Sequence, residues 1–257
     1  MNGTIHETRE GEHVVVVEID NPPRNSLGSA MRKLLRGILA RLAADHSVRA
    51  IVLAGRGNAF CSGDDLREEF EAVAGGGERG ANLVEFGHLL DEVEAFRAPV
   101  IAAVGGWCVG GGFELALCSD IRLASTEAKF VCAGVNVGLM ASAYRLPRLI
   151  GASSAKHMLF TGLAYDAGTA LRFGLVTDVF APADLMPRAI ELASRIASRA
   201  PLSVEASKRI AGQAANLAPA EALALQGQEL SALLHSADHL AALTAFLEKR
   251  TPTFTRS

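Results

Sequence analysis

Short apolar runs alternate with longer amphipathic runs through the first two thirds of the chain. The short runs are rich in β-branched or small apolar residues, which predicts buried β-strands. They cover residues 13–20, 49–55, 99–106 and 120–125. Residues 29–46 and 87–98 instead carry apolar side chains at helical spacing, and Pro99 ends the second run. Strands that are apolar on both faces are typical of parallel sheets, so this part of the chain predicts an α/β fold.

The character of the chain changes near residue 183. Alanine-rich, amphipathic patterns follow one another from there to the C-terminus, and each predicts a helix. They cover residues 185–200, 201–215, 219–235 and 237–250. We therefore divide the chain into an α/β core at residues 1–182 and a helical region at residues 183–257. The glycine-rich stretch at residues 74–82 has the composition of a mobile loop.

Composition and charge argue against several classes of function. Of the 257 residues, 49% are hydrophobic and 21% are charged, and the net charge is -3. This balance gives no reason to expect a nucleic acid or an anionic membrane as a partner. No apolar run approaches the ~20 residues that a membrane span needs. The polar N-terminus resembles neither a signal nor a transit peptide, so we expect a cytoplasmic protein.

The four cysteines predict neither disulfides nor a metal site. Cys61, Cys108, Cys118 and Cys132 form no C-x-x-C pair, and the seven histidines are scattered along the chain. Such a pattern fits a reducing compartment and suggests no zinc site. Free cysteines are often buried, so we expect these four to be small core residues.

Two segments share an unusual order of features. Residues 51–66 (IVLAGRGNAFCSGDDL) and 100–115 (VIAAVGGWCVGGGFEL) each run from a buried strand through a glycine-bearing loop to a helix start. Neighbouring parallel strands would bring the two loops to the same edge of the sheet. Two backbone N–H groups at helix starts could then point at one carbonyl oxygen and form an oxyanion hole. Glu114, in the second segment, could act as the base beside that carbonyl.

Other interpretations of the glycine loops explain less. A dinucleotide-binding fingerprint needs a third glycine where Leu115 stands, and no phosphate-binding P-loop is present. The chain also lacks the G-x-S-x-G motif of serine hydrolases. A structural alternative remains, in which the glycines only allow close backbone packing and Glu114 pairs with an arginine.

These segments resemble a known family. The stretches AFCSGDDL and PVIAAVGGWCVGGGFELALCSDIRLAS are similar to the two signature segments of the enoyl-CoA hydratase/isomerase (crotonase) superfamily. The likeness continues through GVNVGL, LPRLIG, DAGTALRFGLVTDV and AFLEKRTPTF, and so covers essentially the whole chain. The resemblance implies a spiral core of ββα repeats with a helical C-terminal trimerisation region. It also implies an acyl-CoA thioester as substrate, with coenzyme A as part of it and no separate cofactor, and a homotrimer or a dimer of trimers.

The resemblance assigns roles by position. The oxyanion-hole donors would be the backbone N–H groups of Asp64 and Gly111, and Glu114 matches the first of two catalytic glutamates. The positions implied for coenzyme A binding are Arg24, Ala59, Phe60, Gly63, Phe246 and Lys249. The last two would reach the coenzyme A of a neighbouring subunit. For Arg24 and Lys249, a solvated surface charge is an equally good interpretation.

The chain departs from the family at the second catalytic glutamate. Counting twenty residues onward from Glu114 reaches Gly134, so that carboxylate is missing. The following segment, LMASAYRLPRL, lacks the usual glycine-rich stretch and looks about three residues short. Losing a positioned acid or base typically removes ~10²–10⁴ in rate. The substitutes that we consider are Asp64, Asp65, Cys132, Tyr144 and His157.

Three functions remain open from the sequence. The first is an enoyl-CoA hydratase-type enzyme that uses Glu114. The second is another reaction of the superfamily, such as isomerisation, racemisation or decarboxylation. The third is a non-catalytic acyl-CoA-binding protein. The missing glutamate argues against simple isomerisation, whereas Glu114 in an otherwise apolar helix argues against mere binding.

Overall fold

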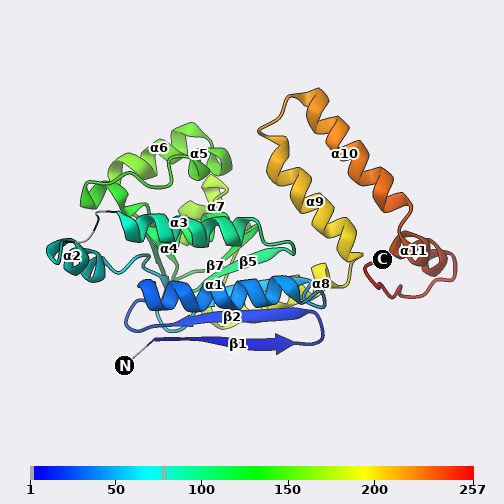
Figure 1. The fold of residues 1–257 in the computed structure, drawn as a ribbon, viewed down its shortest axis with the longest axis horizontal. Helices are drawn as coiled ribbons and strands as arrows, with labels where there is room; N and C mark the ends of the chain where they lie inside the picture. The colour runs from blue at the N-terminus through cyan, green and yellow to red at the C-terminus, as the bar shows by residue number, and fades with distance from the viewer. Residues whose placement is uncertain (1–2, 77, 79) are drawn as a thin grey trace.

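A mixed sheet forms the centre of the molecule (Figure 1). The structure, a computed structural model, describes residues 3–76, 78 and 80–257. The sheet has six strands in the order β1-β2-β3-β5-β7-β10, and only the β1–β2 pair is antiparallel. The strands are β1 (Thr4–Glu10), β2 (Val14–Asp20), β3 (Ala50–Gly55), β5 (Val100–Val104), β7 (Ile121–Ser125) and β10 (Asp178–Phe180). The four strands predicted from apolar runs are therefore confirmed as β2, β3, β5 and β7.

A second, smaller sheet accompanies the first, and the apolar pattern did not predict it. Its strands are β4 (Ala59–Cys61), β6 (Trp107–Val109), β8 (Lys129–Val131) and β9 (Ala164–Asp166), paired in that order. β4, β6 and β8 each follow a strand of the large sheet after a short turn. Helices follow these strand pairs, so the repeated unit is ββα, as the family resemblance implies.

Helices make up most of the remaining chain. They are α1 (Ser29–Ala44), α2 (Leu66–Ala74), α3 (Ala81–Glu94), α4 (Gly111–Cys118), α5 (Arg145–Ile150), α6 (Ala152–Thr161), α7 (Ala167–Phe173), α8 (Pro182–Ala197), α9 (Pro201–Ala214), α10 (Pro219–Leu234) and α11 (Ala237–Leu247), with a 3₁₀ turn η1 (Ala133–Val137). The predicted loop at 74–82 overlaps the end of α2 and the start of α3, and its residues 77 and 79 lie outside the described residues.

Two apolar layers cover the large sheet. On one face α1, α3 and α4 bury side chains such as Leu35, Leu89 and Phe113 against the strands. On the other face α8 packs Leu185 and its alanines over β2, β3 and β5. A fully buried leucine or phenylalanine stabilises the fold by about 1.5–3 kcal/mol. This burial holds the carboxyl ends of the strands, and the loops that follow them, in fixed positions.

The last helices extend away from the sheet (Figure 1). α10 has no buried residue, although more than half of its residues are alanine or leucine. Within the described part of the chain, no single helix is long and apolar enough to cross a membrane. Only α10 and α11 taken together reach that length and composition, across a bend of 67°. The division of the chain at residue 183 stays a prediction.

Candidate active site

The strand order brings the two glycine loops together, as predicted. β3 pairs with β5 and β4 with β6, both in parallel, so the loops leave the sheets side by side. Gly63 has a φ of +86°, and a Cβ added there would lie 2.4 Å from the Gly111 nitrogen. A Cβ at Gly112 would lie 2.0 Å from the Cys61 carbonyl oxygen. Only glycine permits so close an approach of the two backbones.

Two backbone N–H groups at this meeting point have no acceptor among the described residues. Gly111 is the first residue of α4, so its N–H has no partner inside the helix. The Asp64 N–H donates no hydrogen bond to any residue that the structure describes. Both N–H groups are the donors that the sequence predicted, and they flank the contact between Gly63 and Gly111.

The first loop is tied to the start of α1. The Leu27 N–H donates to the Gly63 carbonyl at 2.8 Å, and the Ser62 N–H donates to the Arg24 carbonyl at 3.0 Å. The buried Arg32 guanidinium forms an ion pair with the Asp64 carboxylate. It also donates to the Leu27 carbonyl at 2.9 Å. Burial raises the pKa of Asp64, and the Arg32 charge opposes that rise.

The Glu114 side chain is buried in α4 and only 11% exposed. Its Oε2 lies 3.6 Å from Arg145 Nη1, too far for a hydrogen bond, and this oxygen has no hydrogen-bond partner among the described residues. Arg145 donates instead to Glu94, at 2.7 and 3.1 Å. The structural alternative, in which Glu114 pairs with an arginine, is therefore confirmed only in part. The Arg145 guanidinium lies near the carboxylate but does not form a hydrogen bond with Glu114 Oε2. Such an oxygen is available to a ligand.

The space beside Gly134 is filled by the chain itself. A Cβ at this position would lie 2.9 Å from the Ala141 nitrogen and 3.0 Å from the Leu139 carbonyl oxygen. The segment after η1 thus folds back over Gly134. A glutamate side chain could not start here unless that segment moved.

The five residues considered as substitutes have other surroundings. The Asp64 carboxylate faces Arg32, and the Asp65 carboxylate accepts from the Arg67 N–H at the start of α2. Tyr144 is 60% exposed. The exposed His157 ring packs edge-on against Tyr165. Cys132 alone is buried close to Glu114; burial raises its pKa, the Ser142 hydroxyl lowers it, and the Glu114 charge raises it further.

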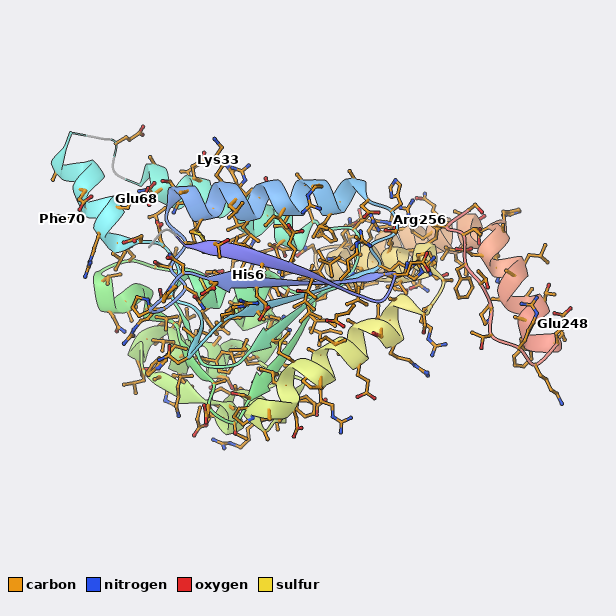
Figure 2. All side chains as sticks on the ribbon, turned by 90° about the horizontal axis from the view of Figure 1, so that it is seen from below. His6, Lys33, Glu68, Phe70, Glu248 and Arg256 are labelled. Atoms are coloured by element: carbon orange, nitrogen blue, oxygen red, sulfur yellow. The ribbon has the colours of Figure 1, made fainter. Side chains whose placement is uncertain are left out.

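The residues predicted to bind coenzyme A fall into two groups. The Arg24 guanidinium lies over the Trp107 ring, 5.9 Å from its centroid. Ala59 and Phe60 are buried beside the first loop, so these two residues can offer a ligand only backbone atoms. Phe246 and Lys249 lie elsewhere. Figure 2 shows Glu248, their neighbour, at the opposite end of the molecule from Glu68 and Phe70, which follow the first loop. One subunit therefore does not bring the two groups together.

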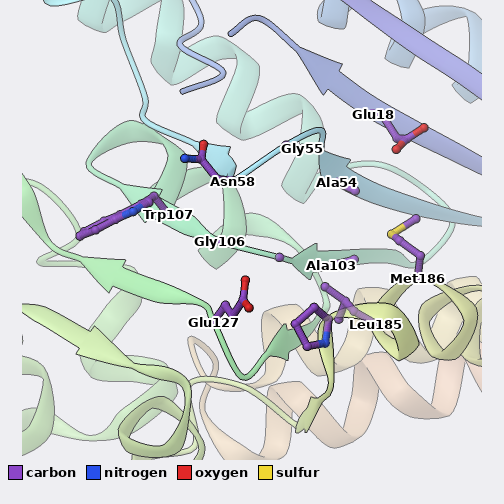
Figure 3. Close-up of a pocket in the computed structure, with 13 residues that line it drawn as sticks. Glu18, Ala54, Gly55, Asn58, Ala103, Gly106, Trp107, Glu127, Leu185 and Met186 are labelled. Carbon is purple, nitrogen blue, oxygen red and sulfur yellow. The ribbon is translucent and has the colours of Figure 1, made fainter. Parts of the chain in front are cut away.

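A cavity of about 330 Å³ lies at the carboxyl ends of β3 and β5, against the start of α8 (Figure 3). Trp107, Glu18, Glu127 and Met186 are among the residues that line it. Its lining includes neither Glu114 nor the glycines where the two loops meet, so we do not assign the candidate site to it.

The structure adds features that the sequence analysis missed. Arg32 and Arg145 contact predicted site residues, and Ser142 is buried next to Cys132 with a φ of +61°. Ser142 and Arg145 both stand in the segment where the family's glycine-rich stretch is expected, but nothing in the sequence singles out either residue. All four cysteines are buried and free, as predicted. No cluster of three metal-ligating side chains occurs within the residues described.

Known proteins agree with this chain in sequence over nearly its whole length. The sequence profile of the family described as Enoyl-CoA hydratase/isomerase matches residues 9–257. The chain is 36% identical to the short-chain-enoyl-CoA hydratase of Clostridium acetobutylicum, over 97% of this chain and 96% of that protein. It is 37% identical to the (E)-benzylidenesuccinyl-CoA hydratase of Thauera aromatica, over 94% of this chain and 95% of that protein.

A solved structure extends the agreement to three dimensions. The crystal structure of an enoyl-CoA hydratase from Bacillus anthracis superposes with a TM-score of 0.92 at 32% identity, over 98% of this chain and 99% of that one. The likeness in sequence and in fold runs nearly from end to end. The chain therefore belongs to the enoyl-CoA hydratase/isomerase family.

Proposed function

We propose that this protein is an enoyl-CoA hydratase-type enzyme that acts on an acyl-CoA thioester. The observation that carries the proposal is the contact between Gly63 and Gly111, because it brings the free N–H of Asp64, in the first loop, close to the free N–H of Gly111, at the start of the helix that bears Glu114. The carboxylate of Glu114 is buried and has an oxygen free to bind. The relatives named as hydratases of CoA thioesters support the same conclusion.

The two loops bind the thioester. Its carbonyl oxygen accepts hydrogen bonds from the N–H groups of Asp64 and Gly111, and each such donor contributes about 10²–10³ in rate. The coenzyme A part runs along Arg24 and the backbone of Ala59, Phe60 and Gly63. Phe246 and Lys249 approach it from a neighbouring subunit. Coenzyme A enters as part of the substrate, and the reaction uses no separate cofactor.

Hydration then proceeds through an enolate. A water oxygen bonds to C3 of the enoyl group while Glu114 takes one proton from that water. The electrons of the C2=C3 bond move toward the thioester carbonyl, whose oxygen becomes negative between the two N–H groups. Glu114 next returns the proton to C2 and the carbonyl re-forms. One water is consumed, and Glu114 ends as it began.

The glycine at position 134 favours a second candidate. A reaction that only moves the α-proton, such as racemisation, or one that releases carbon dioxide, needs no second carboxylate to hold water. The same oxyanion hole and Glu114 would serve it. A protein that binds acyl-CoA without turnover is the remaining alternative, and the buried, unbonded Glu114 carboxylate argues against it.

A panel of acyl-CoA thioesters tests these candidates. We expect loss of the conjugated thioester's absorbance with crotonyl-CoA or a longer enoyl-CoA, and solvent-deuterium exchange at C2 of the saturated thioesters. Calorimetric titration should show binding of the thioesters but not of the free acids, because coenzyme A supplies remote binding energy. Exchange without hydration on every chain length would favour the second candidate. Tight binding with neither reaction would contradict an enzymatic function.

A further inference from the structure

Gly134 has no side chain to offer to the site, and the segment that packs against it leads to another polar residue, Ser142. The chain from Leu139 to Ala141 packs on Gly134 and continues into Ser142, just before α5. Ser142 is only 5% exposed. Its backbone has a φ of +61°, a conformation that residues other than glycine seldom adopt. Strain of this kind is commonly found at functional sites.

The Ser142 hydroxyl makes no hydrogen bond of ordinary geometry with any described residue, although it lies close enough to the Cys132 thiol to lower the pKa of that thiol. Its Oγ and Glu114 Oε2 are two of the few buried side-chain atoms without one among the described residues. Buried polar atoms are normally hydrogen-bonded, so each such exception calls for an explanation. A hydrogen bond with a bound water or a substrate oxygen would satisfy each of these two atoms.

Several contacts put the two oxygens in the same region. The Cys132 Sγ lies 3.8 Å from the Ala141 carbonyl oxygen, next to Ser142 in the chain. The Ser142 hydroxyl and the Glu114 charge both act on the pKa of the Cys132 thiol. Arg145, three residues after Ser142, approaches the Glu114 carboxylate to 3.6 Å. The Arg145 guanidinium thus lies beside the Glu114 oxygen that has no hydrogen bond, and Ser142 and Glu114 both lie near the Cys132 thiol.

We propose that Ser142 holds the attacking water at Glu114, in place of the absent second glutamate. The proposal rests on the hydratase function proposed above. Ser142 Oγ accepts a hydrogen bond from one O–H of the water, and Glu114 takes the proton of the other. The oxygen then bonds to C3, and Glu114 delivers its proton to C2. Ser142 is neither protonated nor deprotonated in the reaction, so a neutral hydroxyl suffices for this role.

The test compares two reactions that share Glu114 but differ in their need for a held water. In Ser142→Ala we expect the kcat of enoyl-CoA hydration to fall about 10- to 100-fold, because the attacking water is no longer held in position and misplaced reactants typically lose that much rate. The KM and the rate of deuterium exchange at C2 of a saturated acyl-CoA should stay at the wild-type level. Ser142→Gly should behave in the same way, and glycine accepts the positive φ, so this variant keeps the test valid if the alanine variant folds poorly. Ser207→Ala, which removes an exposed hydroxyl on α9, is the matched control.

Three outcomes would overturn the proposal. Wild-type hydration in both Ser142 variants would show that the hydroxyl holds no reacting water. A parallel loss of exchange and hydration would mean that Ser142 supports the structure of the site rather than the water. A wild-type protein that exchanges the α-proton but never hydrates would contradict the hydratase function itself, and Ser142 with it.

Discussion

Glu114 carries the chemistry in the proposed mechanism, and a single substitution isolates its part. Glu114→Gln keeps the volume of the side chain but cannot accept a proton. We expect hydration to fall by about 10²–10⁴, the usual contribution of a positioned acid or base. Binding of the thioester should persist, because the N–H groups of Asp64 and Gly111 are unchanged. Absorbance assays and calorimetric titration measure the two effects separately.

Glu127→Gln is the matched control for this experiment. Glu127 lines the separate cavity beside α8 and takes no part in the proposed reaction. Its variant should hydrate at the wild-type rate. If Glu114→Gln retained full activity, Glu114 would be a structural residue and the base would have to be sought elsewhere.

The role proposed for Glu114 could be inferred from the sequence, whereas the role proposed for Ser142 could not. Glu114 is a lone carboxylate in an apolar helix directly after three glycines, and these features are local. Ser142 becomes noticeable only through its burial and its backbone angle. Both depend on how residues 139–142 fold over Gly134, and no short-range pattern encodes that path.

The helix α1 and the first glycine loop act as one unit through the Arg32–Asp64 ion pair. Both side chains are less than 10% exposed. Breaking a buried pair by removing one partner leaves an uncompensated charge, which costs about 3–5 kcal/mol. We therefore expect Arg32→Met to lower the free energy of unfolding by that amount in urea titrations.

A double variant supplies the control. Arg32→Met combined with Asp64→Ala removes both charges, so most of the lost stability should return. The alanine keeps the backbone N–H that we propose as an oxyanion donor. A double variant as unstable as Arg32→Met alone would show that the methionine disturbs packing, and that the ion pair is not what holds the loop.

Periodicity predicted some elements better than others. The tail helices have several turns of repeated apolar spacing, and the structure confirms each of them. β4, β6 and β8 have three residues each, which is too short for any period to stand out. They form because the preceding strands, β3, β5 and β7, pair in parallel, and this pairing places the segments that follow them side by side.

The subunits are expected to associate through the C-terminal helices. α10 and α11 expose many large apolar side chains, namely Leu223, Leu230, Leu234, Leu240, Leu243, Phe246 and Leu247. An exposed apolar surface of this kind is typical of a protein–protein interface. We propose a homotrimer or a dimer of trimers, in which these helices pack on neighbouring subunits.

Light scattering on Leu230→Asp/Leu234→Asp tests this association. A buried charge opposes docking, so the variant should shift toward the monomer while the wild type remains a trimer or hexamer. Its affinity for acyl-CoA should fall as well, because Phe246 and Lys249 then have no neighbour to reach. Leu171→Asp, at an exposed leucine of α7, should change neither property. A monomeric wild type that binds acyl-CoA would disprove the interface.

The sequence was enough to predict the parallel α/β core, the helical tail and the meeting of the Gly63 and Gly111 loops. These features follow from local rules, namely apolar periodicity and the need for glycine at close contacts. The ion pair of Arg32 with Asp64, the approach of Arg145 to Glu114 and the burial of Ser142 required the folded chain. Each of them joins different structural elements, and the distances between those elements are set by core packing rather than by any neighbour in the chain.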